Sequence, residues 1–177
     1  AAAMDLLEIL RRRRSVRQYV PGEIPAEALE MILQAGMLSP TGKGLRPWEF
    51  IVVRNPETLR ALAGCRTTPV PMLQNAACAI VVLGDGEASD VWVEDCSAVM
   101  TQMHLMADAL GLGSCWVQGR LREASDGRSA ETYVQALLGY PERFHLEAIL
   151  ALGRIDRHPE PHSLEQLPRE KIHHETF

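Results

Sequence analysis

Residues 79–83 read Ala-Ile-Val-Val-Leu without a polar interruption, which is the pattern of a β-strand buried on both faces. A strand with one solvated face would alternate apolar and polar side chains. We therefore expect a sheet that is covered on both sides.

Helical and extended patterns alternate along the rest of the chain, which predicts an α+β fold. The order is too irregular for a series of βαβ units. Other strands are expected at 50–53, 114–117 and 148–152. Helices are expected from a capping box at Asp5 and Glu8 into the following arginines, from Pro25 towards Pro40, and at 55–62, 91–110 and 130–138.

The longest predicted helix, 91–110, carries apolar residues at three- and four-residue steps and ends at Gly111. Its methionines, Met100, Met103 and Met106, are interpreted as core filling. Glu94 and Asp95 are interpreted as carboxylates on the helix face, not as catalytic acids.

Composition sets the class of protein. The chain has 177 residues, 46% of them apolar, and we expect residues 4–177 to form a single domain after a three-alanine cloning remnant at 1–3. A net charge of −5 argues against a nucleic-acid binder. No apolar stretch has the length of a membrane span, and four widely spaced cysteines indicate reduced thiols, so a cytoplasmic protein is expected.

Against this acidic background, five arginines lie within seven residues: Arg11, Arg12, Arg13, Arg14 and Arg17, with Ser15 among them. Guanidinium groups beside a hydroxyl form a receptor for phosphate, because the planar fork binds two oxygens together. The alternative is a solvated run of charge. This segment alone does not decide between the two.

Two other polar, glycine-bearing segments flank predicted strands, residues 39–48 and 111–119. Gly111-Leu112-Gly113 is not a dinucleotide fingerprint, because it follows a helix and precedes a strand. Walker A, G-x-S-x-G and H-E-x-x-H sequences are absent from the chain. No metal site is expected, since His173 and His174 have no third ligand in view.

Together the three segments resemble the nitroreductase family of FMN-dependent oxidoreductases: Arg13-Arg14-Ser15-Val16-Arg17, the stretch from Ser39 to Phe50, and Gly111 to Gly119. The resemblance implies a mixed, mostly antiparallel sheet flanked by helices. It also implies an intertwined homodimer with FMN at the interface. Residues 156–177, which hold little core content, are expected to pack on the partner subunit.

The resemblance also assigns roles. Arg13 and Ser15 would hold the phosphate end of FMN, Arg17 would lie near the pyrimidine edge, the 40–44 loop would come from the partner, and the N–H groups of Gln118 and Gly119 would lie near flavin N5 and O4. The implied cofactor-binding residues are Arg13, Arg14, Ser15, Arg17, Pro40, Thr41, Gly42, Gly44, Trp116, Val117, Gln118 and Gly119. The implied activity is hydride transfer from NADH or NADPH, through flavin N5, to a small electron-poor acceptor such as a nitroaromatic or quinone, in a ping-pong cycle. The flavin carries this chemistry, so no catalytic side chain is implied.

The sequence departs from the family pattern at four places. Gly44 stands where an asparagine is usual, and Arg46 stands where a glutamine is frequent. Residues 161–165 contain no lysine or arginine, and the 66–72 loop lacks the asparagine and lysine that some members direct at the pyrimidine. FMN binding weaker than is typical is therefore expected. The alternative function is a non-redox, anion- or nucleotide-binding homodimer with a degenerate flavin site.

Overall fold

The computed structural model describes residues 2–68 and 70–177. Its middle layer is a four-stranded sheet in the order β1-β2-β4-β3, in which every neighbouring pair is antiparallel. The strands are β1 (Trp48–Val53), β2 (Cys78–Asp85), β3 (Leu112–Gln118) and β4 (Phe144–Arg154). The α+β class and the mostly antiparallel sheet are confirmed. Each observed strand extends beyond the residues predicted for it from the apolar pattern.

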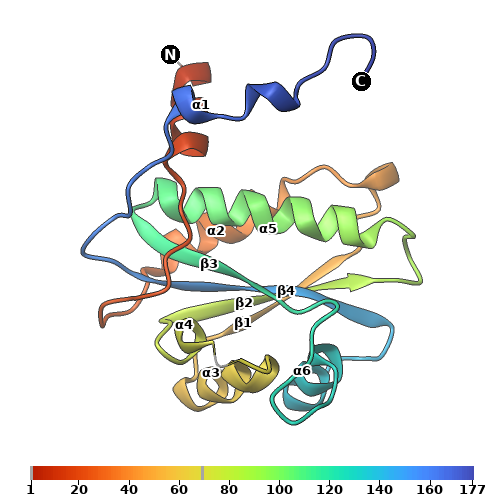
Figure 1. Ribbon diagram of the computed structural model, residues 1–177. Helices are drawn as coiled ribbons and strands as arrows, with labels where there is room; N and C mark the ends of the chain where they lie inside the picture. Colours follow the sequence, from red (N-terminus) through yellow and green to blue (C-terminus); the bar gives the residue numbers. More distant parts are fainter. Residues whose placement is uncertain (1, 69) are drawn as a thin grey trace.

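Helices cover both faces of this sheet (Figure 1). One face carries α2 (Ala26–Met37) and α5 (Trp92–Ala109), and the other carries α3 (Pro56–Leu62), α4 (Pro71–Gln74) and α6 (Ala130–Leu138). Short 3-10 turns are η1 (Gly42–Gly44), η2 (Ala63–Cys65), η3 (Leu164–Gln166) and η4 (Arg169–Lys171). Within the described part of the chain, no helix combines the length and apolar character that crossing a bilayer requires.

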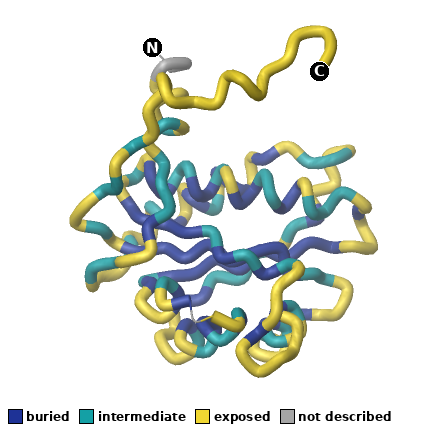
Figure 2. The backbone as a smooth tube through the Cα atoms, in the orientation of Figure 1, coloured by how far each residue is buried: buried dark blue, intermediate teal, exposed yellow. Residues whose placement is uncertain are grey.

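Strand β2 is buried along its whole length, as its sequence predicts (Figure 2). Ala79, Val81 and Leu83 belong to the core cluster beneath α3 and α6. Cys78, Ile80 and Val82 alternate with them and belong to the cluster beneath α2 and α5. An uninterrupted apolar strand is thus divided between two cores, one on each face of the sheet.

Two helix starts follow the expected chemistry. Asn55 caps α3 by accepting from the N–H groups of Glu57 and Thr58, at 2.9 and 3.2 Å. Ser129 caps α6 by accepting from Thr132 N–H. The capping box proposed at Asp5 is wrong, because α1 (Ala2–Arg12) begins before it and the Glu8 carboxylate pairs with Arg11 at 2.6 Å.

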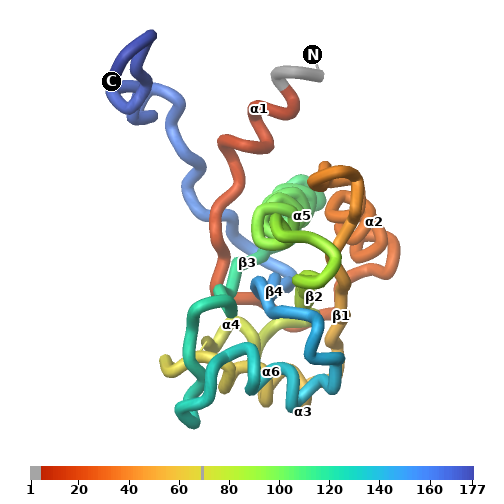
Figure 3. The backbone as a smooth tube through the Cα atoms, turned by 90° about the vertical axis from the view of Figure 1, so that its right-hand side faces the viewer, coloured from red at the N-terminus to blue at the C-terminus, as the bar shows by residue number. Residues whose placement is uncertain are grey.

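Helix α1 and the tail after β4 project together from the α5 side of the body (Figures 1 and 3). The tail is tied to α1 by the His162 N–H, which donates to Arg11 O at 3.1 Å. His158 Nε2 contacts Asp108 Oδ1 of α5 at 2.5 Å. Beyond these contacts the tail residues are exposed. Its packing on a partner subunit stays a prediction.

The chain between α1 and α2 crosses β3 and β4 at a pair of glycines, which have no side chains to block it. Gly113 and Gly153 are paired across the two strands. A Cβ on Gly153 would lie 2.3 Å from Tyr19 Cγ, and one on Gly113 would lie 3.1 Å from Val16 Cβ. The missing side chains therefore make room for the segment that carries the arginine cluster.

We expect Gly153→Ala to destabilise the protein by about 1–3 kcal/mol, because its methyl group must displace the Tyr19 ring. Urea unfolding of the two proteins measures the loss. In a Tyr19→Ala background the same substitution should cost much less. An equal cost in both backgrounds would show that the ring is not the obstacle.

Candidate functional site

A cavity of about 260 Å³ brings the first and third predicted segments together. Arg17 lines it from one side, and Cys115, Trp116 and Val117 of β3 line it from another. The two segments are joined beside it, where Val16 N–H donates to Ser114 O at 2.9 Å. The structure therefore brings together two of the three segments, which lie almost a hundred positions apart in the sequence.

Arg66 is a second cation on this cavity that the sequence interpretation missed. Its guanidinium donates to Gln118 O at 3.2 Å. The 66–72 loop lacks the asparagine and lysine that some family members direct at the pyrimidine. Arg66 is the one basic residue in that loop, and this was the available signal.

The arginines of the first segment have separate surroundings. Arg13 Nη1 lies 3.2 Å from His104 Nε2 of α5. Arg14 donates to the backbone oxygen of Glu160 in the tail. Arg17 is exposed on the cavity, and Ser15 is half-buried between them. Arg11 pairs with Glu8 and Arg12 with Asp108, which sets both apart from the cavity.

Strand β3 has an open edge on the cavity side. The Ser114 and Gln118 carbonyls accept from Val16 and from Arg66, so both point away from β4. The N–H and C=O of one strand residue share a direction, so the Gln118 N–H also faces this edge. The Gly119 N–H instead donates to Glu147 O at 3.3 Å, a long bond within the sheet.

Glu147 is a buried carboxyl behind this edge, and its burial is not predicted by the sequence pattern. The register between β2 and β4 shifts at Val82 and Leu83, which leaves Glu147 in a bulge. Only 2% of the residue is exposed, and Oε2 lies 2.7 Å from Ser97 Oγ. Burial raises the pKa of Glu147, and the Ser97 hydroxyl opposes this.

The second predicted segment, which includes Pro40, Thr41, Gly42 and Gly44, lies at the opposite end of α5 from the arginines (Figure 1). A single chain therefore does not bring it to the cavity. Asp95 of α5 fixes this loop, because its Oδ1 accepts from Gly42 N–H at 3.0 Å. Asp95 is 6% exposed, so its interpretation as an ordinary helix-face carboxylate is wrong.

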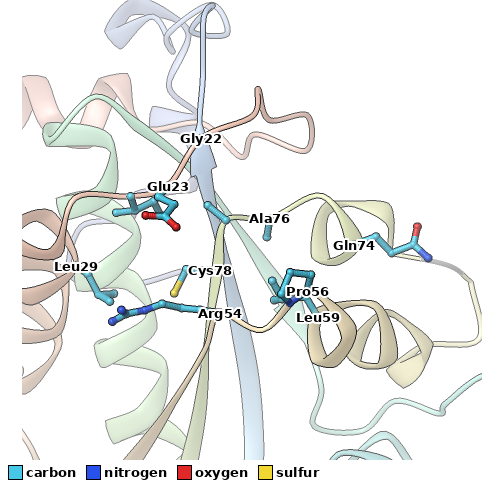
Figure 4. Close-up of a pocket in the computed structure, with 11 residues that line it drawn as sticks. Gly22, Glu23, Leu29, Arg54, Pro56, Leu59, Gln74, Ala76 and Cys78 are labelled. Carbon is cyan, nitrogen blue, oxygen red and sulfur yellow. The ribbon is translucent and has the colours of Figure 1, made fainter.

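A larger cavity, of about 380 Å³, lies at the ends of β1 and β2 (Figure 4). Glu23 and Arg54 line it, and Figure 4 shows Cys78 between them. None of the three predicted segments lines it. Size alone therefore does not identify the functional site, and the chemistry of the smaller cavity carries more weight.

His104 links the fold's stability to pH. Burial lowers its pKa to about 4 from the ordinary 6.5, and the Arg13 charge acts in the same direction. Between these values the unfolded chain binds more protons than the folded chain. The free energy of unfolding should therefore fall as pH decreases from 6.5 to 4, by on the order of 3 kcal/mol.

In His104→Gln, which does not titrate, this contribution should be absent. Urea unfolding of both proteins at pH 7 and pH 4.5 measures the difference. Parallel losses of stability in the two proteins would contradict the assignment.

The donor set suits a phosphorylated, planar anionic ligand. Guanidinium groups bind phosphate and the electron-rich edge of a ring, and the open edge of β3 offers backbone donors. Burial raises the pKa of the Cys115 thiol, so this thiol is not a ready nucleophile. Gly119, which follows β3, has no room for a side chain, since a Cβ there would lie 2.4 Å from Leu146 Cδ2.

The fold and this cavity define an α+β protein of the nitroreductase fold. The chain is 40% identical to the FMN-dependent nitroreductase of Clostridium difficile R20291, with a TM-score of 0.92 over 97% of this chain and 99% of that one. A Desulfovibrio desulfuricans protein, provisionally assigned as a nitroreductase and crystallised with FMN, gives a TM-score of 0.74 at 27% identity, covering 97% of each chain.

Sequence comparison agrees. The Nitroreductase family model matches residues 10–66 and 65–154. An Archaeoglobus fulgidus protein, provisionally named NADH dehydrogenase/NAD(P)H nitroreductase, is 38% identical over 153 residues, which is 84% of each chain. The chain belongs to the nitroreductase family.

Proposed function

We propose that this protein is an FMN-dependent oxidoreductase that takes electrons from NADH or NADPH and reduces a small electron-poor acceptor, such as a nitroaromatic or a quinone. The observation that carries the proposal is the cavity where Arg17 and Arg66 meet the open edge of β3. Relatives named as NAD(P)H nitroreductases and a neighbour crystallised with FMN support it.

The arginine segment would bind the two polar ends of FMN. Arg13 and Ser15 would hold the phosphate, which carries nearly two negative charges at neutral pH. Arg17 would lie at the pyrimidine edge, and Arg66 would be a second cation for that edge. Arg14 would support the phosphate end from its position between Arg13 and Ser15.

Strand β3 would lie along the ring. Trp116 and Val117 would contact its face, and the outward N–H of Gln118 would serve as a donor to flavin N5 or O4. The Gly119 N–H is already paired with Glu147 O, so its role would require that long bond to exchange partners.

FMN, when bound, supplies the two-electron chemistry and needs no acid or nucleophile from the protein. The contribution of the chain is electrostatic and positional. Arg17 and Arg66 would stabilise negative charge that develops on the pyrimidine edge. The β3 backbone would fix the orientation of the ring.

A homodimer would complete the site. The loop of Pro40, Thr41, Gly42 and Gly44 is far from the cavity of its own chain and would line the flavin of the partner. Helix α1 exposes three leucines, Leu6, Leu7 and Leu10, which a partner subunit would bury. The projecting tail, with exposed Leu167 and Ile172, would pack on the partner.

The test is the colour of the purified protein. We expect a yellow protein with a flavin spectrum, or one that becomes yellow on adding FMN, and anaerobic bleaching by NADH or NADPH. A protein that takes up no FMN would overturn the proposal in favour of the non-redox alternative. Sedimentation equilibrium, with and without FMN, tests the homodimer.

A further inference from the structure

His104 lies between two parts of the proposed flavin site without belonging to either. It is on α5 and 5% exposed. Its Nε2 is 3.2 Å from Arg13 Nη1, and its Nδ1 is 2.5 Å from Ser114 Oγ. One ring therefore connects the first arginine of the site to the strand that lines the cavity.

The partners of the ring fix its protonation. A guanidinium only donates hydrogen bonds, so Nε2 must be the acceptor. The remaining ring proton then lies on Nδ1 and is donated to Ser114 Oγ. A doubly protonated ring would put a hydrogen opposite the Arg13 donor. The geometry thus requires a neutral imidazole with its proton on Nδ1.

The charged groups around the ring are consistent with this. Arg13 and Asp108 are the charged side chains that influence it. The Asp108 carboxylate already interacts with His158 Nε2, 2.5 Å from its Oδ1, and with Arg12 Nε, 3.5 Å from its Oδ2. Within residues 2–68 and 70–177, Arg13 has no carboxylate partner at salt-bridge distance, so its positive charge is left for a ligand.

We propose that His104 is a positioning residue for the flavin phosphate: the neutral ring, held by Ser114, accepts one N–H of Arg13 and so directs the rest of the guanidinium fork at the phosphate. This inference rests on the proposed function. A neutral acceptor suits the task, because a carboxylate in its place would neutralise the charge that phosphate needs. One N–H is used, and the others remain for bidentate binding.

Two variants of similar polarity separate positioning from mere packing. In His104→Gln the longer amide reaches the Nε2 position and still accepts from Arg13. In His104→Asn the shorter amide can still bond Ser114 but does not reach Arg13. Fluorescence titration with FMN and with riboflavin, which lacks the phosphate, gives the readout for each protein.

We expect His104→Asn to weaken FMN binding by roughly tenfold and to leave riboflavin binding unchanged. His104→Gln should bind FMN nearly as well as the unmodified chain. In an Arg13→Ala background, His104→Asn should have no further effect on FMN. This combination would establish that His104 acts through Arg13.

Equal weakening of FMN and riboflavin by His104→Asn would refute the positioning role and indicate a structural one. Unchanged binding of both flavins would refute it as well. If the unmodified protein binds neither flavin, the proposed function itself fails, which is a distinct result. Circular dichroism of each variant confirms that folded proteins are compared.

Discussion

In the Arg13→Ala variant, FMN affinity should fall by about a hundredfold or more, while riboflavin affinity stays close to that of the unmodified protein. Arg13 is half-buried, has no carboxylate partner at salt-bridge distance among the described residues and is held by His104. A charge-assisted, bidentate contact with phosphate is among the strongest polar interactions available to a side chain. Equilibrium dialysis with each flavin measures the two affinities.

Arg12→Ala is the matched control, because it removes a neighbouring positive charge that already faces Asp108 at 3.5 Å. It should retain FMN to within a few-fold. If the two variants lose FMN equally, general positive charge is responsible, and Arg13 has no specific role.

Replacing Arg17 with glutamine should lower the reduction potential of bound FMN, by on the order of 50 mV, or about 2 kcal/mol for two electrons. A cation beside the pyrimidine edge favours the reduced flavin, which carries more negative charge there. Glutamine keeps a hydrogen-bond donor and removes only the charge. The effect should weaken at high salt, because Arg17 is exposed.

Anaerobic titration against reference dyes of known potential gives the measurement. Arg60→Gln removes an exposed charge on α3, outside this cavity, and should leave the potential unchanged. A potential that does not move in Arg17→Gln would place Arg17 away from the ring. Arg66→Gln then becomes the variant that identifies the cation at this edge.

Local patterns in the sequence were sufficient to predict elements that depend only on neighbouring residues. The 79–83 strand, the Asn55 cap and the helix at 130–138 follow from apolar runs and capping chemistry. The capping box at Asp5 failed because Glu8 has a second possible partner, Arg11, one turn away. The spacing of residues alone does not show whether Glu8 bonds the backbone at Asp5 or the side chain of Arg11.

The site was predictable only in part, because it depends on which elements face each other. The three segments were found as patterns, and the structure joins the first and third. His104 and Asp95 lie on a helix whose periodicity shows which residues are inward but not what they contact. Glu147 is buried through a bulge in β4, and the register between two strands is not visible in the sequence of one of them.

The crossing of the N-terminal segment over the glycine pair has a consequence for the order of synthesis. Val16 is held by Ser114 of β3, whereas Val20 is held by Arg154 and Tyr19 lies against Gly153, both of β4. Part of the anchorage of the early arginines therefore comes from the last strand to leave the ribosome. A nascent chain that lacks β4 can hold this segment only through α5 and β3, by the contacts of Arg12, Arg13 and Val16. The complete support of the arginine segment therefore forms only after β4 has been translated.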